Sequence, residues 1–306
     1  MKTVYYLLKP IIPWHVRMSI RRMMANRLRR RHVDCWPIQK SAAKAPQNWP
    51  GWPDGKQFAF VLTHDVEGTR GLQRCKKLAE LDKALGFRSS FNFVPEGEYR
   101  LPADLHTYLN QEGFEVGVHD LHHDGSLYRS LRGFKGQAQI INQYLKSWGA
   151  VGFRSGFMFH NLEWLKDLSV LYDASTFDVD PFEPQPDGVN TIFPFWVPSG
   201  GPADGYVELP YTLPQDSTLF LLFKERTIAV WTKKLDWVAE HGGMALLNVH
   251  PDYINFKGRE TSSEFSAELY ESFLKHVMNR YQSSCWFALP RDVAKYVARF
   301  KPIWPA

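Results

Sequence analysis

The sequence of 306 residues contains little cysteine and no long apolar run. Its three cysteines, Cys35, Cys75 and Cys285, are too few and too scattered for a disulfide framework or a cysteine-based zinc site. No apolar run approaches the roughly 18–20 residues that a transmembrane helix needs. The short apolar run at residues 3–8 is followed by no small-residue cleavage site, so we expect no secretory signal. We therefore expect a protein of the reducing cytoplasm, held at most peripherally at the inner face of a membrane.

Acidic residues are absent from residues 1–31, which carry nine of the 37 lysines and arginines. The rest of the chain holds 28 basic and 32 acidic residues, so the pI near 9.0 belongs to this N-terminal arm. A basic charge confined to one segment gives no reason to expect a nucleic-acid partner. Two interpretations of the arm remain open. It contacts an anionic membrane surface through residues 1–31, or it packs loosely on the rest of the protein as a solvated segment.

Residues 36–56 contain four prolines among polar residues and indicate a linker. We therefore divide the chain into a basic arm with a proline-rich linker, residues 1–56, and a single domain, residues 57–306.

Apolar strand-like runs alternate with helical patterns from residue 57 onward. The expected strands are 58–62, 89–94, 114–118, 151–154, 171–177, 206–209, 244–249 and 286–289. The expected helices are 69–85, 102–113, 128–148, 161–169, 227–240, 263–280 and one that starts at Pro290. Seven or eight such alternations predict an α/β barrel of parallel strands in one domain. Residues 178–205 are rich in proline and glycine and predict a long irregular loop, of a kind that is often functional.

Polar residues follow several of these strands, at the end where parallel barrels place their active sites. His119 and His123 are four residues apart, a spacing that lets two imidazoles bind one ion. With Glu67 they make a candidate site of two histidines and one carboxylate that leaves a position open for water. His122 is the alternative ligand, at a less suitable spacing. The alternative to a metal site is that these are loop histidines beside local carboxylates.

Four stretches, in this order along the chain, resemble motifs of the polysaccharide deacetylases of carbohydrate esterase family four, which share the NodB homology domain. The resemblance spans roughly residues 57–300. Thr63–Glu67 resembles the first motif in its Asp-x-Asp form, with Glu67 in place of the second aspartate. His119–His123 resembles the second motif, with Asp120 in place of a hydroxyl residue.

The later motifs match less completely. Arg154–Gly156 resembles the third motif without its proline, and Leu246–His250 resembles the fifth. Residues 172–178 stand where the fourth motif would fall, but they lack its usual tryptophan.

The resemblance implies a distorted, NodB-like (β/α) barrel of seven or eight parallel strands that hydrolyses an amide with the help of a metal. Asp65 would be the general base, His250 the general acid, and Arg154 the residue that orients Asp65. One divalent ion would be held by Glu67, His119 and His123. Zinc is favoured by these nitrogen and oxygen donors, although cobalt or nickel can substitute.

The substrate implied is an acylated amino sugar, with N-acetyl as the expected acyl group. It would be a lipid-linked or polysaccharide precursor in cell-surface polysaccharide biosynthesis. We expect substrate contacts from Asp178, Glu208 and Trp196, and Asp216 is a further candidate near the same rim. The aromatic residues of the long loop either stack on sugar rings or pack within the loop.

Two alternatives remain open on the sequence. One is a hydrolase of a non-sugar C–N bond. The other is a catalytically silent carbohydrate-binding barrel, which the departures at Glu67, Asp120 and Ser155 keep open. The sequence leaves the oligomeric state undetermined.

Overall fold

The computed structural model describes residues 14–199, 205–258 and 261–304. The first 13 residues of the basic arm and residues 200–204 of the long loop lie outside this description. The sheet is built around β1 (Phe58–Val66), which is buried along its whole length. One edge of β1 pairs with β8 (Met244–Asn248), and the other pairs first with β11 (Cys285–Phe287) and then with β2 (Ser90–Phe93). A strand covered on both faces is expected to be apolar throughout, as residues 58–62 are.

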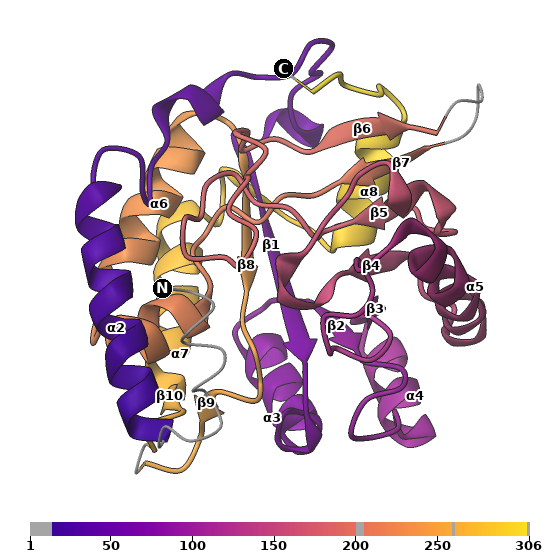
Figure 1. Ribbon diagram of the computed structural model, residues 1–306. Coiled ribbons are helices and arrows are strands. Elements are labelled where there is room, and N and C mark those ends of the chain that lie inside the picture. The colour runs from indigo at the N-terminus through magenta and orange to yellow at the C-terminus, as the bar shows by residue number, and fades with distance from the viewer. Residues whose placement is uncertain (1–13, 200–204, 259–260, 305–306) are drawn as a thin grey trace.

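The remaining strands continue outward from β2 in one curled sheet of nine strands (Figure 1). They are β3 (Glu115–His119), β4 (Gly152–Arg154), β5 (Tyr172–Asp173), β7 (Gly205–Glu208) and β6 (Phe195–Pro198). All pairings in this sheet are parallel except β6 with β7. After β7, Thr212 and Leu213 donate their backbone N–H groups to the Leu246 carbonyl of β8, at 3.2 and 3.1 Å. These bonds bring the far edge of the sheet back towards β1, which confirms the predicted distorted barrel.

Helices surround the sheet. They are α3 (Thr69–Ala84), α4 (Ala103–Gln111), α5 (Leu131–Trp148), α6 (Ala229–Glu240), α7 (Ala267–Tyr281) and α8 (Pro290–Ala298). In α5 the Ser130 hydroxyl caps the Gly133 N–H, and Gly149 ends the helix in the left-handed conformation at φ 63°. Because Phe134, Ala138, Ile141 and Leu145 recur at helical spacing, they bury one face of α5 against the sheet.

The structure differs from the sequence-based expectation in the short elements. The expected helix at 161–169 is only the 3₁₀ turn η4 (Trp164–Asp167), and β6 was not expected within the long loop. Further elements were not predicted. They include the helix α2 (Trp14–Arg31), the π-helical turn η5 (Ser217–Leu222), and the strands β9 (Ile254–Asn255) and β10 (Phe265–Ser266), which pair in a small separate sheet. Within the described ranges, no helix is both long and apolar enough to cross a bilayer.

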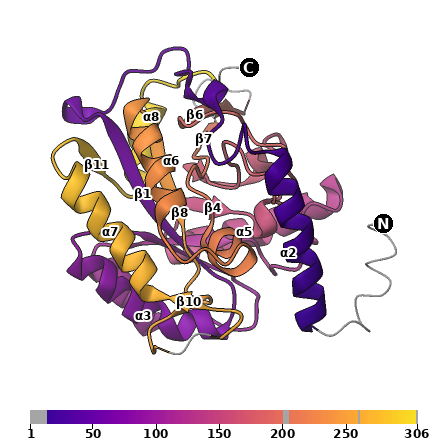
Figure 2. The same ribbon diagram turned by 90° about the vertical axis from the view of Figure 1, so that its left-hand side faces the viewer.

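Residues 36–56 do not separate the arm from the barrel, as a linker would. Trp36, Ala42 and Trp52 are buried, and the Trp52 indole N–H donates to the Gly242 carbonyl at 2.8 Å. The Ala42 carbonyl accepts the Ile192 N–H at 3.0 Å. This segment is therefore part of the domain, and it carries α2 along the outside of the barrel (Figure 2).

A buried ion pair joins α6 to the long loop. The Lys234 ammonium group of α6 contacts the Asp178 carboxylate and the Pro37 carbonyl, the latter at 2.5 Å, and both charged side chains are essentially inaccessible to solvent. Burial lowers the pKa of Lys234 and raises the pKa of Asp178 to about 6. Two desolvated charges are tolerable only while each compensates the other.

Replacing Lys234 with methionine should therefore lower the free energy of unfolding by about 3–5 kcal/mol, because the Asp178 carboxylate is left buried without a partner. Urea unfolding measures this. The matched control is Lys233→Met, on the exposed side of the same helix, which should change stability by no more than about 0.5 kcal/mol. Equal effects of the two substitutions would contradict the assignment.

Candidate metal and catalytic site

The polar residues singled out in the sequence meet where neighbouring strands end. The parallel register sets Asp65 of β1 beside Asn92 of β2, and Thr63 of β1 beside Asn248 of β8. His119, the last residue of β3, is likewise beside Arg154 of β4. Parallel strands end at one edge, so residues far apart in sequence share a single site.

Glu67, His119 and His123 form a cluster whose ligand atoms lie within 4.8 Å of one another. His119 Nδ1 is 3.1 Å from the Arg154 carbonyl, which can only accept, so Nδ1 carries the proton and Nε2 keeps its lone pair. The Nε2 atoms of both histidines are buried without a hydrogen-bond partner, and His123 Nε2 is 3.3 Å from Glu67 Oε1. Burial lowers the pKa of His119 and so favours the neutral form that binds metals. Two unpartnered imidazole nitrogens beside a carboxylate are a donor set that fits a divalent cation.

The turn after β3 brings His123 back towards His119. Asp120 and His123 both adopt positive φ, at 57° and 55°, and the two imidazole rings lie 4.8 Å apart. The Asp120 carboxylate accepts the backbone N–H groups of Leu121 at 2.6 Å and Gly156 at 3.1 Å. A β-carbon at Gly156 would fall 2.5 Å from Asp120 Oδ2. Asp120 therefore fixes the turn after Arg154, and position 156 has no room for a side chain.

His122, the alternative ligand, lies outside the cluster. Its side chain is 38% exposed, and its Nδ1 is 3.7 Å from Glu96 Oε2. The structure therefore groups His123, and not His122, with His119.

Asp65 is buried and held from three sides. Its Oδ1 accepts from the Asn92 amide at 2.9 Å, and its Oδ2 accepts from the Asn248 amide at 2.7 Å. Arg154 is fully buried and places one guanidinium nitrogen 3.4 Å from both oxygens, and it also donates to the Thr63 hydroxyl at 2.8 Å. Burial alone would raise the pKa of Asp65, but Arg154, then His119 and His250, hold it well below its usual range. Asp65 is therefore ionised and can accept a proton.

His250 is paired with Asp216, the residue that precedes η5. His250 Nδ1 is 2.6 Å from Asp216 Oδ1, and Asp216 Oδ2 accepts a hydrogen bond from the backbone N–H of His250 at 2.8 Å. Burial would lower the pKa of His250, but Asp216, followed by Glu67, raises it to about 10. His250 Nε2 is 3.7 Å from Glu67 Oε1, so the imidazolium faces the metal-ligand cluster. Asp216 thus positions His250, whereas the sequence suggested a substrate contact for it.

Glu67 is supported by the loop after β8. Its backbone N–H donates to Asp252 at 2.9 Å, and its Oε2 accepts from the Tyr253 hydroxyl. Asp252 also accepts the N–H of Gly71, where any β-carbon would fall 2.1 Å from its Oδ2. Burial would raise the pKa of Glu67, but His250 and His123 lower it to about 2, so Glu67 is a carboxylate.

Two of the three expected substrate contacts are buried, contrary to the expectation. Asp178 and Glu208 are buried, with their carboxylates bonded to Lys234 and to Thr176 respectively, so neither faces a substrate. Trp196 lies on β6, with the Lys301 ammonium group 4.7 Å from the centre of its ring.

Sequence reasoning missed Asn92, Asn248, Tyr253 and Asp252. Asn248 did carry a signal, since it is a polar residue at the end of an apolar strand, and Asn92 is a polar residue between two phenylalanines of another strand.

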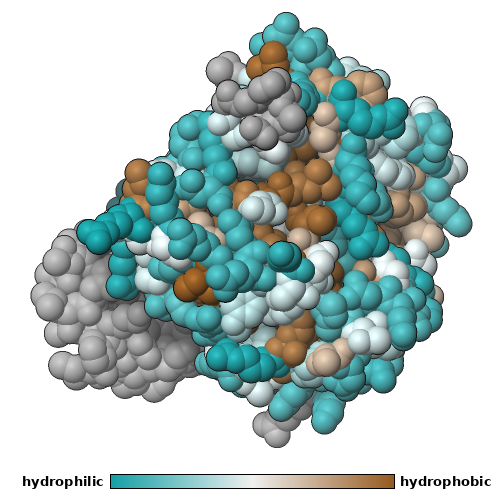
Figure 3. Space-filling view, turned by 90° about the vertical axis from the view of Figure 1, so that its right-hand side faces the viewer, coloured by the Kyte–Doolittle hydropathy of each residue, from teal (hydrophilic) through white to brown (hydrophobic). Residues whose placement is uncertain are grey.

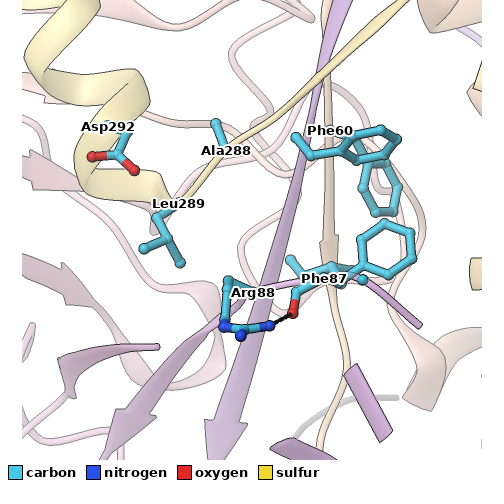
Figure 4. Close-up of a pocket in the computed structure, with 9 residues that line it drawn as sticks. Phe60, Phe87, Arg88, Ala288, Leu289 and Asp292 are labelled. Atoms are coloured by element: carbon cyan, nitrogen blue, oxygen red, sulfur yellow. Dashed lines mark hydrogen bonds between the residues drawn. The ribbon is translucent and has the colours of Figure 1, made fainter. Parts of the chain in front are cut away.

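A cavity of about 230 Å³ opens elsewhere, where β1 passes from β11 to β2. Phe60, Phe87, Leu289 and Asp292 line it (Figure 4). Phe87 and Arg88 precede β2, so this cavity is at the opposite end of the strands from Asp65 and Asn92.

Several solved structures align with this chain. A Mycobacterium smegmatis protein assigned as a polysaccharide deacetylase aligns with a TM-score of 0.64 and 17% identity, over 86% of this chain and 97% of its own. Peptidoglycan deacetylase PdaC from Bacillus subtilis aligns at 0.47 and 13%, over 81% of this chain and 94% of its own. BA3943, a pseudoenzyme of carbohydrate esterase family four from Bacillus anthracis, aligns at 0.47 and 13%, over 79% of this chain and 66% of its own.

The first of these likenesses shows the fold: this chain has the NodB-like barrel, and in fold it resembles a polysaccharide deacetylase. No protein-family model matches the sequence, and the comparison with curated proteins found no match.

The cluster of Glu67, His119 and His123 predicts that protein purified without a chelator contains about one divalent ion per chain. Elemental analysis measures this. His119→Ala and Glu67→Gln should lose the ion because each removes one of three ligands. Asp65→Asn should keep it. The matched control is His122→Ala, which removes a neighbouring imidazole outside the cluster and should leave the metal content unchanged. Retention of the ion by His119→Ala together with its loss from His122→Ala would reverse the ligand assignment.

Proposed function

We propose that this protein is a metal-dependent hydrolase that removes an N-acyl group from an amino sugar. The observation that carries the proposal is the meeting of three groups at one edge of the barrel. These are an ionised buried carboxylate, Asp65, an imidazolium, His250, and the donor set of Glu67, His119 and His123. A base, an acid and a metal site within one cluster are what the hydrolysis of an unactivated amide requires.

A divalent ion held by Glu67, His119 and His123 would polarise the acyl oxygen and make water a better nucleophile. Asp65 takes the proton from the attacking water, because its pKa keeps it ionised at neutral pH. Arg154, Asn92 and Asn248 keep its two oxygens in place during this transfer.

The water oxygen forms a bond to the acyl carbon, and the C–N bond breaks. His250 gives its Nε2 proton to the departing amine, and Asp216 stabilises the imidazolium from which that proton comes. The products are a carboxylic acid and a free amino sugar.

An aromatic ring at the rim of the site supports a sugar substrate. Phe157 lies in the 3₁₀ turn η3 (Gly156–Met158), which comes shortly after Arg154. The residue is 42% exposed, and its ring stacks on the imidazole of His123 with 4.6 Å between the ring centres. It adopts the left-handed conformation at φ 57°, which costs free energy in a residue of this size. An exposed apolar ring beside the metal ligands can stack on the apolar face of a pyranose, and we assign this contact to Phe157.

We propose an N-acetylated amino sugar of a lipid-linked or polysaccharide precursor as the substrate, in cell-surface polysaccharide biosynthesis. The fold shared with the M. smegmatis protein supports carbohydrate deacylation in general. The lipid link is suggested by the basic helix that begins the described chain.

The test is a panel of N-acetylated and N-formylated amino sugars, free and lipid-linked, with release of acetate or formate as the measurement. Metal-loaded protein should deacylate at least one of them, and Asp65→Asn should lower the rate on the order of 10²–10⁴-fold, as expected for a lost general base. Sugar binding with no acid released would favour a silent carbohydrate-binding barrel. Turnover confined to amides without a sugar would favour the hydrolase of a non-sugar C–N bond.

Phe157→Ala should raise the KM for sugar substrates about 3–10-fold, because a stacking contact is lost, while kcat changes little. Phe157→Tyr keeps the ring and should behave as the wild type. An aryl acetate, which has no sugar ring, should show the same KM with all three proteins. If Phe157→Ala instead loses the metal, the ring only supports His123 and is not a sugar contact.

A further inference from the structure

One side of α2 is fixed against the barrel. The Arg29 guanidinium is 2.7 Å from Glu225 and lies 4.6 Å from the ring of Phe223. Arg22 donates to the Leu221 carbonyl at 3.3 Å, and Ala25 is buried. Because these contacts recur at helical spacing, they determine which side of the helix faces away from the protein.

The outward side of α2 combines exposed apolar and basic side chains. Met23 and Met24 are 66% and 56% exposed, and Arg27, Arg30 and Arg31 are exposed as well. Within the described residues none of these three arginines forms an ion pair, and α2 contains no acidic residue. At about 100° per residue, this surface is opposite the side that carries Arg22, Ala25 and Arg29.

The N-terminal end of this helix is on the same side of the molecule as the catalytic end of the barrel. It begins at the end of the molecule towards which β1 points, as both ribbon views show (Figures 1 and 2). It docks on η5, through the Leu221 carbonyl, and Asp216 immediately precedes η5 and holds His250. Residues 23–31 lie in the second half of α2, which runs away from that end.

We propose that the outward face of α2, residues Met23, Met24, Arg27, Arg30 and Arg31, binds the surface of an anionic phospholipid bilayer. The arginines match the negative headgroups, and the two methionines can enter the boundary between headgroups and acyl chains. The phosphates of a nucleic acid would match the arginines but give the exposed methionines no apolar partner. The interaction does not depend on the proposed reaction, and it can hold or fail independently of it.

The experiment is co-sedimentation of the full chain with phosphatidylcholine vesicles that contain or lack phosphatidylglycerol. The wild type should bind the vesicles with phosphatidylglycerol, and added salt should weaken the binding. The triple variant Arg27→Gln, Arg30→Gln, Arg31→Gln should bind on the order of 100-fold more weakly, because three basic contacts with the headgroups are lost. Met23→Ser with Met24→Ser should weaken the binding that remains at high salt.

The matched control removes the same charge from α5, which lies on the other side of the molecule in Figure 1, on a largely hydrophilic face (Figure 3). Arg132, Lys135 and Lys146 are exposed there, and their triple replacement by glutamine should leave vesicle binding within a few-fold of the wild type. Equal weakening by the two triple variants would show that only net charge matters and would overturn the proposal. Absence of wild-type binding, or tighter binding to a DNA duplex than to the vesicles, would overturn it as well.

Discussion

The buried carboxylate of Asp65 is the constraint on which the site depends. Removing a carboxylate from water is costly unless donors replace the lost solvent. Here the donors come from three strands: Asn92 from β2, Arg154 from β4 and Asn248 from β8. A slip of register in any of these strands would leave the charge uncompensated, so the pairing of the sheet and the ionisation of Asp65 are coupled.

Three other aspartates hold the loops around this centre, and each does so by accepting hydrogen bonds with its carboxylate. Asp216 accepts the N–H of His250, Asp252 accepts the N–H of Glu67, and Asp120 accepts the N–H of Gly156. A carboxylate that accepts backbone N–H groups is stabilised, and it fixes the loop that donates them. The positions of the proposed acid, of the carboxylate ligand and of the turn after Arg154 therefore each depend on one aspartate outside the reaction.

Hydrogen bonds and close contacts explain how the structure accommodates Asp120 and Glu67, two residues that depart from the motifs the sequence resembles. Asp120, which replaces a hydroxyl residue, requires glycine at 156 because a β-carbon there would meet its carboxylate. Glu67, longer than the usual aspartate, has its second oxygen bonded by the Tyr253 hydroxyl, which leaves the first oxygen near His123 and His250. These contacts hold the carboxylates of Asp120 and Glu67 in place, although both residues differ from those usual in the motifs that the sequence resembles.

Much of the fold and of the central site could be read from the sequence. The alternation of strands and helices is a local pattern of apolar residues, and His119 and His123 are close enough in sequence for their spacing to predict a shared ligand site. The helix α2 was missed because its arginines and methionines form no clear apolar stripe until the contacts with residues 217–225 define one side.

What only the tertiary structure decided is which distant side chains meet and which face the interior. Asn248 is 183 residues from Asp65, and Asp216 is 34 residues from His250, so no local period relates them. Asp178 and Glu208 are acidic residues that the sequence suggested as substrate contacts, yet the fold buries both against interior partners. Burial and partnership of a charged side chain depend on the packing of elements far apart in the chain. The sequence by itself determined most of the long strands and helices and the chemistry at the strand ends, because these follow from local patterns of apolar and polar residues.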